Sequence, residues 1–455
     1  MTCVALITND AVGTKMAGPG IRYWELAGAL ARQGITVHLI VPPFVPLEDA
    51  FPSDAAFAIH APRTATALRA LLVDCDVLVT LGIVLAYYPF LTTLQIPLVV
   101  DLYDPFLLSG LQRTAADPFQ RQVEANQQYL AALQIQLRAG DFFLCAAEKQ
   151  RDYWLGMLSA LGRLNPYTYK QDPTFRQLID VLPFGIPSQY PVHTQAMLKG
   201  VYPGIGPEDK VLLWGGGIWN WFDAPTLIRA LPLILRQRDD VKLFFMGTQR
   251  PNPSGPKMDA VDEAIGLSRS LGLYGTHVFF NDWTPYELRQ NFLLDADIGV
   301  SLHLDYVETR FAFRTRLLDY LWAGLPIVAT TGDILGEDLA AQGVAKLVPP
   351  QDPAAVATCV LDLLAEDDVS RAARASRVRA IAARYHWDAI VQPLADFCRA
   401  PCFAADREYI QQFPLGIEER GLGKWVHKIH RALQAGGVRE LLRRGRAYWH
   451  WKRQQ

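Results

Sequence analysis

Three consecutive glycines, Gly215, Gly216 and Gly217, follow an apolar run in the segment 214–223, which reads WGGGIWNWFD. Glycines at the end of a strand cost backbone entropy, and close approach of a phosphate to main-chain N–H groups is one reason to keep them. The alternative is a tight turn with nothing bound. We favour a phosphate site here.

A weaker version of this pattern lies near the N-terminus, in AGPGIR, where Gly18, Gly20 and Arg22 stand between a strand-like run and a helix-like run. Such a loop points a helix N-terminus at a ligand. It lacks the full GxGxxG spacing and the Lys-Ser/Thr of a phosphate loop, so a turn that needs positive φ is the favoured alternative.

The segment 313–330, FRTRLLDYLWAGLPIVAT, combines charges with a helix break. Arg314 and Arg316 precede Asp319, and Gly324 then leads through a proline into a β-like run. A helix that only packs in a core needs none of these charges. The pattern therefore indicates a helix that begins at a functional site.

Further polar residues follow predicted strands. Asp101 and Asp104 lie at the end of one, and His303 and Asp305 follow another, at the edge where open α/β sheets bind ligands. Two turn-forming aspartates would explain the first pair equally well. We find no HExxH motif and no convincing set of metal ligands in the sequence.

The elements that carry these residues alternate between strand and helix. Short apolar runs such as CVALI, ITVHLIV and IPLVV alternate with helical patterns, which predicts parallel sheets covered on both faces. The Pro- and Gly-rich segment 182–210 reads as a linker, after which the alternation restarts. The uncharged run 77–100 is long enough to span a bilayer, but its prolines and flanking aspartates favour strand, turn, helix and strand.

Length and charge agree with two domains and a distinct tail. The chain has 455 residues, half of them hydrophobic, and a net charge of −2. Residues 420–455 hold ten Lys or Arg and one acid, a balance of +9, so the remaining 419 residues carry −11. This basic, tryptophan-bearing amphipathic tail indicates an anionic membrane surface as partner. A helix packed on the protein's own acidic surface and a disordered tail remain alternatives.

Charge, cysteine content and the N-terminus also indicate the partners and the cellular location of the protein. No specific nucleic-acid partner is indicated, because the overall charge is nearly balanced. Six scattered cysteines and an N-terminus without a signal-peptide pattern predict a reduced, cytoplasmic protein, which we expect to lie peripherally at the inner membrane face.

The second half of the chain resembles the retaining glycosyltransferases of family 4, which have the GT-B fold. The resemblance rests on GGGIWNWFDAPTLIRAL, NDWTPYELRQNFLLDADIGVSLHL and RTRLLDYLWAGLPIVATTGD, and covers about residues 1–405. It implies two Rossmann-like α/β domains facing across a cleft. We expect them at 1–185 and 211–390, with a linker at 186–210, a crossover helix and connection at 391–419, and the basic tail at 420–455.

The resemblance implies transfer of a sugar from a nucleotide-sugar, without a metal or other cofactor. Asp319 would bind the ribose, Arg316 the diphosphate with Arg314 as second choice, Trp283 would flank the base, and the three glycines would meet the phosphates. Attack on the front face would retain the anomeric configuration, with the leaving phosphate taking the acceptor's proton. On the acceptor side we expect Asp104 and the loop of Gly18, Gly20 and Arg22.

Two departures from the family pattern matter. The acid usually found eight residues before Asp319 is replaced by Phe311, so Glu308 is the candidate for that role. The family's Arg and Lys after the glycine loop are missing, since Ile218 and Phe222 stand there. An inactive scaffold that binds a sugar nucleotide or a partner, and a nucleotide-sugar epimerase, are therefore alternatives to a hexosyltransferase. The acceptor would be lipid-linked or a polysaccharide.

Overall fold

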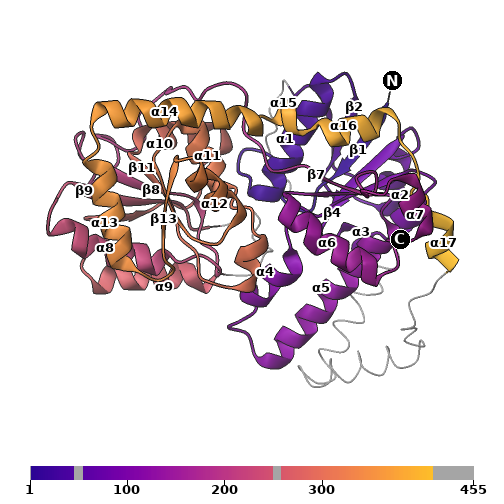
Figure 1. Ribbon diagram of the computed structural model, residues 1–455, viewed down its shortest axis with the longest axis horizontal. Helices are drawn as coiled ribbons and strands as arrows, with labels where there is room; N and C mark the ends of the chain where they lie inside the picture. The colour runs from indigo at the N-terminus through magenta and orange to yellow at the C-terminus, as the bar shows by residue number, and fades with distance from the viewer. Residues whose placement is uncertain (1, 46–54, 250–257, 413–455) are drawn as a thin grey trace.

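The computed structural model describes residues 2–45, 55–249 and 258–412. Each of two sheets is parallel throughout and flanked by helices, and the two domains lie side by side (Figure 1). The predicted fold class, two Rossmann-like α/β domains, is confirmed. The predicted basic tail, 420–455, lies outside the described residues.

The N-terminal sheet has the strand order β3-β2-β1-β4-β5-β6-β7. The interior strand β1 is apolar at every position because both of its faces are covered: Val4 and Leu6 pack into one core, and Ala5 and Ile7 into another. The elements of this domain are β1 (Cys3–Ile7), α1 (Gly18–Arg32), β2 (Thr36–Ile40), β3 (Ala58–His60), α2 (Ala65–Leu71), β4 (Val77–Leu81), α3 (Val84–Tyr87), η1 (Pro89–Thr93), β5 (Leu98–Asp101), α4 (Phe106–Arg113), α5 (Phe119–Ala139), β6 (Phe142–Cys145), α6 (Glu148–Ala160), α7 (Pro166–Gln171) and β7 (Ile179–Val181).

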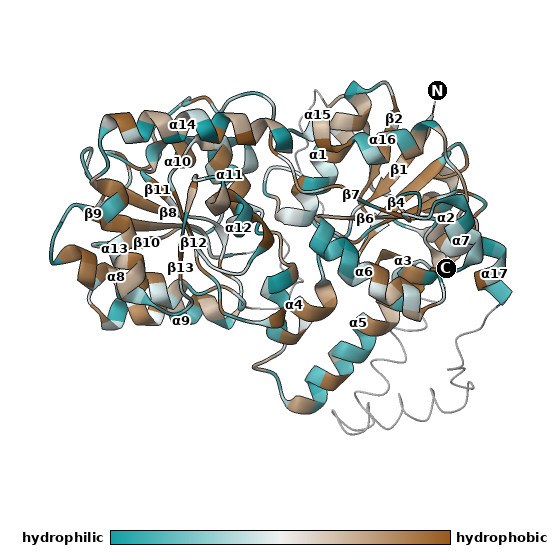
Figure 2. Cartoon of the chain, viewed as in Figure 1, coloured by the Kyte–Doolittle hydropathy of each residue, from teal (hydrophilic) through white to brown (hydrophobic). Residues whose placement is uncertain are grey.

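The C-terminal sheet has the order β10-β9-β8-β11-β12-β13. Its strands are brown, and thus hydrophobic, against helices of mixed colour in Figure 2. Its elements are β8 (Lys210–Gly217), α8 (Ala224–Leu235), β9 (Val241–Gly247), α9 (Asp259–Ser270), β10 (Val278–Phe280), η2 (Tyr286–Leu288), α10 (Arg289–Asp295), β11 (Ile298–Ser301), η3 (Val307–Phe311), α11 (Arg316–Ala323), β12 (Ile327–Thr330), α12 (Ile334–Ala341), β13 (Ala345–Val348) and α13 (Pro353–Leu364).

The chain then crosses back to the N-terminal domain. Helix α14 (Asp368–Ala382) runs along the C-terminal domain and leads through η4 (Ala383–Tyr385) to α15 (Trp387–Ile390) and α16 (Gln392–Arg399), which lie over the N-terminal domain (Figure 1). The linker and this crossover pair at Ile186 and His386. Helix α17 (Arg407–Gln412) returns to the N-terminal domain, where Asp406 forms a buried ion pair with Arg163, Nε to Oδ2 2.8 Å.

The uncharged run 77–100 folds as β4, α3, η1 and β5, which confirms the expected strand, turn, helix and strand. Among the described helices, none combines the length and the apolarity that crossing a bilayer requires. The predicted helix break at the end of α11 is also present. Gly324 takes φ +73°, a left-handed conformation suited to glycine, and β12 begins three residues later.

Candidate functional site

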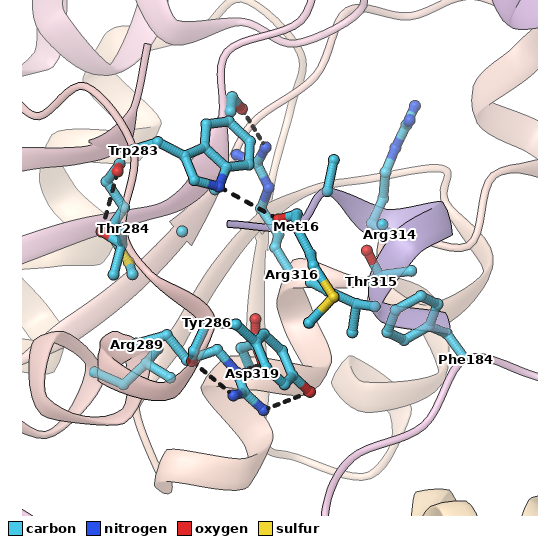
Figure 3. A pocket seen from close by; sticks show the side chains of 18 of the residues that line it. Met16, Phe184, Trp283, Thr284, Tyr286, Arg289, Arg314, Thr315, Arg316 and Asp319 are labelled. Atoms are coloured by element: carbon cyan, nitrogen blue, oxygen red, sulfur yellow. Dashed lines mark hydrogen bonds and ion pairs between the residues drawn. The ribbon is translucent and has the colours of Figure 1, made fainter. Parts of the chain in front are cut away.

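A cleft between the two domains collects most of the residues that the sequence singled out. It is lined from the N-terminal domain by the loop that enters α1 and from the C-terminal domain by the loops after β8 and β10 and by the start of α11 (Figure 3). Its empty volume is about 1030 Å³, part of it open solvent. The cleft lies at the carboxyl ends of the strands, where doubly wound sheets bind ligands.

The glycine loop forms the floor of this cleft at the end of β8. Gly215, Gly216 and Gly217 all line it, and Gly216 has φ +75°. The Gly215 N–H donates to the Tyr320 hydroxyl at 2.7 Å, which fixes the loop against α11. A Cβ on Gly217 would lie 2.9 Å from the ring of Trp219, so glycine is needed there to seat the indole.

Arg316 reaches this floor from the first turn of α11. Its Nη2 donates to the Gly217 carbonyl at 2.8 Å, and its guanidinium lies 3.8 Å from the Phe222 ring centroid and 4.5 Å from that of Trp214. Its Nη1 is buried with no hydrogen-bond partner in the described chain. Burial lowers the pKa of Arg316 to about 10. An arginine held in place with a spare donor is suited to an anion.

Arg314 also lines the cleft, but its charge is already paired. Its Nη1 and Nη2 donate to the two carboxylate oxygens of Glu308 at 3.1 and 2.7 Å, and both side chains are 5 % exposed. The structure therefore places two predicted site residues in one bidentate ion pair. Glu308 itself does not line the cleft.

Asp319 lies one turn into α11, at the edge of the cleft, with its side chain 38 % exposed. Burial of part of the group raises its pKa, and Arg289 and Arg316 oppose that rise. Its nearest cation is Arg289, whose Nε lies 3.5 Å from Oδ1.

Arg289 is a cleft residue that the sequence reading missed. It begins α10, and its guanidinium lies 3.6 Å from the Tyr286 ring centroid (Figure 3). The Trp322 ring centroid lies 4.7 Å away. Arg289 is thus a third cation in the cleft beside Arg314 and Arg316. Its neighbours Glu287, Gln290 and Asn291 are also polar, so the local sequence does not distinguish it from a surface arginine.

Trp283 closes the cleft from the loop after β10. Its ring fills the space that a Cβ on Gly247 would need, at 2.7 Å, and its Nε1 donates to the Met16 carbonyl of the N-terminal domain at 3.3 Å. The rings of Trp283 and Trp219 lie 6.4 Å apart. The position predicted to flank a base is therefore lined by the two indole rings of Trp283 and Trp219.

The N-terminal loop residues take three different positions. Gly18 lines the cleft, whereas Gly20 lets α1 pack against the Ala11 carbonyl, which a Cβ would meet. Arg22 is fully buried and forms a bidentate pair with Asp101 at 2.6 and 3.0 Å. Helix α1 begins at Gly18, so Arg22 comes one turn later on the inner face of the helix and away from the cleft.

Asp104 lies outside the cleft, beside the ion pair of Glu308 and Arg314. Burial and the charge of Glu308 raise its pKa to about 6, against the opposing effects of Arg113 and Arg314.

His303 is fully buried, with Nε2 3.5 Å from the Asp333 carboxylate, and does not line the cleft. Within the described ranges, no group of three His, Cys, Asp or Glu side chains could hold a metal ion.

Residues 209–366, about a third of the chain, match the family model described as Glycosyl transferases group 1. No curated protein matches the sequence significantly. Among solved structures, the chain resembles the sucrose-phosphate synthase of Thermosynechococcus elongatus, with 16 % identity and a TM-score of 0.63 over 88 % of this chain and 98 % of that one.

Two further structures show the same likeness. WaaG, a glycosyltransferase involved in lipopolysaccharide biosynthesis, is 17 % identical with a TM-score of 0.60, over 87 % of this chain and all of that one. Anabaena HepE in complex with UDP-glucose is 15 % identical with a TM-score of 0.58, over 88 % and 100 %. The family match confirms the predicted enzyme class, a glycosyltransferase, for the C-terminal domain, and the neighbours confirm the GT-B fold.

Proposed function

We propose that this chain, with its group 1 glycosyltransferase domain, transfers a sugar from a nucleotide-sugar to an acceptor bound across the cleft. The observation that carries the proposal is Arg316 beside the glycine loop, whose buried Nη1 has no hydrogen-bond partner among the described residues. An unpaired buried cation is costly, and a diphosphate would supply the missing acceptors.

The donor is proposed to lie along the cleft from Trp283 to α11. The base would stack on Trp283, the ribose hydroxyls would donate to Asp319, and the diphosphate would face Arg316, the three glycines and the N-terminus of α11. The complexes of Anabaena HepE with UDP and with UDP-glucose support a nucleotide-sugar as the donor class.

The reaction is proposed to proceed with retention and without a metal. The acceptor hydroxyl would attack the anomeric carbon from the face that the diphosphate leaves, the bond between that carbon and the phosphate oxygen would break, and the phosphate would take the acceptor's proton. Arg316 would meet the charge that develops on the leaving group. Asp104 and Glu308 would act only at the edge of this site, since neither lines the cleft.

Incubation with a panel of UDP-, GDP- and ADP-sugars tests the proposal. Release of a nucleoside diphosphate, by hydrolysis or by transfer to added sugars and lipid-linked acceptors, is the expected result. Tight nucleotide binding with no turnover would indicate an inactive scaffold, and conversion of the donor into its epimer without release would indicate an epimerase. Absence of both binding and turnover would overturn the proposal.

The proposed cellular place is the cytoplasmic face of a membrane, reached through the basic residues 420–455. These residues lie outside the described ranges, so the proposal rests on composition alone. Deleting them should abolish sedimentation of the protein with vesicles that contain phosphatidylglycerol. Unchanged sedimentation would contradict an anchoring role.

A further inference from the structure

A continuous chain of polar contacts joins the two domains beside the candidate donor site. It begins at Glu25 on α1, whose Oε1 accepts a hydrogen bond from the Tyr286 hydroxyl at 2.6 Å. The same hydroxyl accepts from Nη2 of Arg289 at 3.0 Å. Arg289 then faces Asp319, Nε to Oδ1 3.5 Å. One residue of the N-terminal domain is thereby connected to the carboxylate proposed to bind the ribose.

The arrangement fixes Arg289 more firmly than it fixes Asp319. Its Nη1 donates to the Tyr286 carbonyl at 2.9 Å, and its guanidinium also contacts the rings of Tyr286 and Trp322. Its contact with Asp319 is a single long one, and the Asp319 side chain stays 38 % exposed. Asp319 is therefore oriented by Arg289 while its remaining acceptor positions face the cleft.

The Tyr286 hydroxyl both donates and accepts a hydrogen bond within the described chain. It donates to Glu25 and accepts from Arg289, and the backbone N–H of Tyr286 donates to the Thr14 carbonyl of the N-terminal domain at 2.9 Å. With Trp283 bonded to Met16, the loop before α10 makes three hydrogen bonds across the cleft. Tyr286 thus acts between the domains and, through Arg289, on Asp319.

We propose that Arg289 and Tyr286 are positioning residues that couple contact between the domains, at Glu25, to the orientation of Asp319 for the nucleotide. The proposal rests on the proposed function, since it assumes that Asp319 binds the ribose. Coupling of this kind is reciprocal. A change that breaks the contact at Glu25 weakens nucleotide binding, and bound nucleotide stabilises the contact at Glu25.

The experiment is a double-mutant cycle on the full chain. Tyr286→Phe removes only the hydroxyl and leaves the ring under Arg289, and Glu25→Ala removes its acceptor. Isothermal titration with UDP, GDP and ADP should show each single variant binding the preferred nucleoside diphosphate about tenfold more weakly than wild type. The double variant should lose no more than either single one, because both changes break the same chain.

A control ion pair lies in the C-terminal domain away from the cleft. Arg238 pairs with Asp240, Nη2 to Oδ2 2.7 Å, both side chains are about one-third exposed, and neither lines the cleft. Arg238→Ala should leave nucleotide affinity unchanged. Arg289→Lys, which keeps the charge but not the planar fork, should bind as weakly as Tyr286→Phe, and should raise the KM for the donor more than it lowers kcat.

Hydrogen exchange provides a readout that a loss of stability alone would not move. In wild type, nucleotide should slow exchange of the Tyr286 amide, which donates to Thr14, and in Glu25→Ala this slowing should be reduced. Unchanged affinity in both single variants, or losses that add in the double variant, would overturn the coupling while the proposed function stands. A wild type that binds none of the nucleotides would overturn both.

Discussion

Replacing Arg316 by methionine should stabilise the ligand-free protein and lower its affinity for a nucleoside diphosphate. The reason is the environment of the guanidinium. It is 8 % exposed, donates to the Gly217 carbonyl, lies against the rings of Phe222 and Trp214, and leaves Nη1 without a partner among the described residues. Methionine keeps an unbranched apolar stem and removes the charge.

The magnitude follows from the pKa of Arg316, which burial lowers to about 10 from an ordinary value of about 12.5. Since each pKa unit corresponds to about 1.4 kcal/mol, keeping this cation charged in the folded protein costs about 3 kcal/mol. Loss of the hydrogen bond to the Gly217 carbonyl destabilises the variant by about 1 kcal/mol and so reduces this gain. The lowered pKa of Arg316 destabilises the folded wild type at every pH below about 10. The net gain of about 1–2 kcal/mol in Arg316→Met should therefore be constant across neutral pH.

The effect on binding has the opposite sign. Charge-assisted hydrogen bonds contribute about 1.5–3 kcal/mol, which predicts diphosphate affinity about 10- to 150-fold weaker in Arg316→Met. Urea denaturation of the free protein gives the stability term, and titration with UDP, GDP and ADP gives the affinity.

Arg314→Met is the matched comparison, because it lies two residues away in the same segment. It should lose about 3–5 kcal/mol of stability, since it leaves Glu308 buried and unpaired. An Arg316→Met protein that is less stable than wild type, or that keeps its diphosphate affinity, would refute this account of the site.

Three further predictions concern other parts of the chain. Arg22→Met should lower the free energy of unfolding by about 3–5 kcal/mol in urea, because it strands the buried Asp101 carboxylate; a loss below 1 kcal/mol would contradict this. The raised pKa of Asp104, about 6, means that its stability contribution is full below pH 4 and is lost as pH rises through 6. Wild type should therefore lose stability relative to Asp104→Asn between pH 4 and 7. Parallel curves of unfolding free energy against pH for the two proteins would argue against this raised pKa. Gly299→Ala should cost at least about 2 kcal/mol, seen as a lower Tm, because a Cβ there would collide with the ring of Tyr320.

The fold was predictable because each signal for it is local. Apolar runs of four to eight residues gave strands buried on both faces, and the helix stop at Gly324 followed from a conformation that glycine adopts readily. The gathering of the glycine loop, Arg316 and Asp319 in one cleft was likewise accessible, because loops at the carboxyl ends of parallel strands meet at one edge of the sheet.

The partners of these residues were not predictable, because they come from distant parts of the chain. Tyr286 and Glu25 are 261 positions apart, and no periodicity in either segment signals their contact. Arg314 and Glu308 are only six apart, but Glu308 lies in the short 3₁₀ segment η3, whose turn brings the two side chains together. Arg22 stood next to a glycine loop in the sequence and yet points into the core, since α1 begins earlier than the loop pattern suggested.

The aromatic residues around the glycine loop explain why the cations of this cleft lie elsewhere. The rings of Trp219 and Trp283 occupy the space beside Gly217 and Gly247, at the ends of the neighbouring strands β8 and β9. Ile218 and Phe222, which stand where the family pattern has its Arg and Lys, are buried apolar side chains. Arg316 and Arg289 enter instead from α11 and α10, and Arg316 donates to the Gly217 carbonyl. Charge that the family places on the loop is thus carried by helices, and one of those helices, α10, also contacts the N-terminal domain through Tyr286. The strength of donor binding should for this reason depend on how the two domains meet.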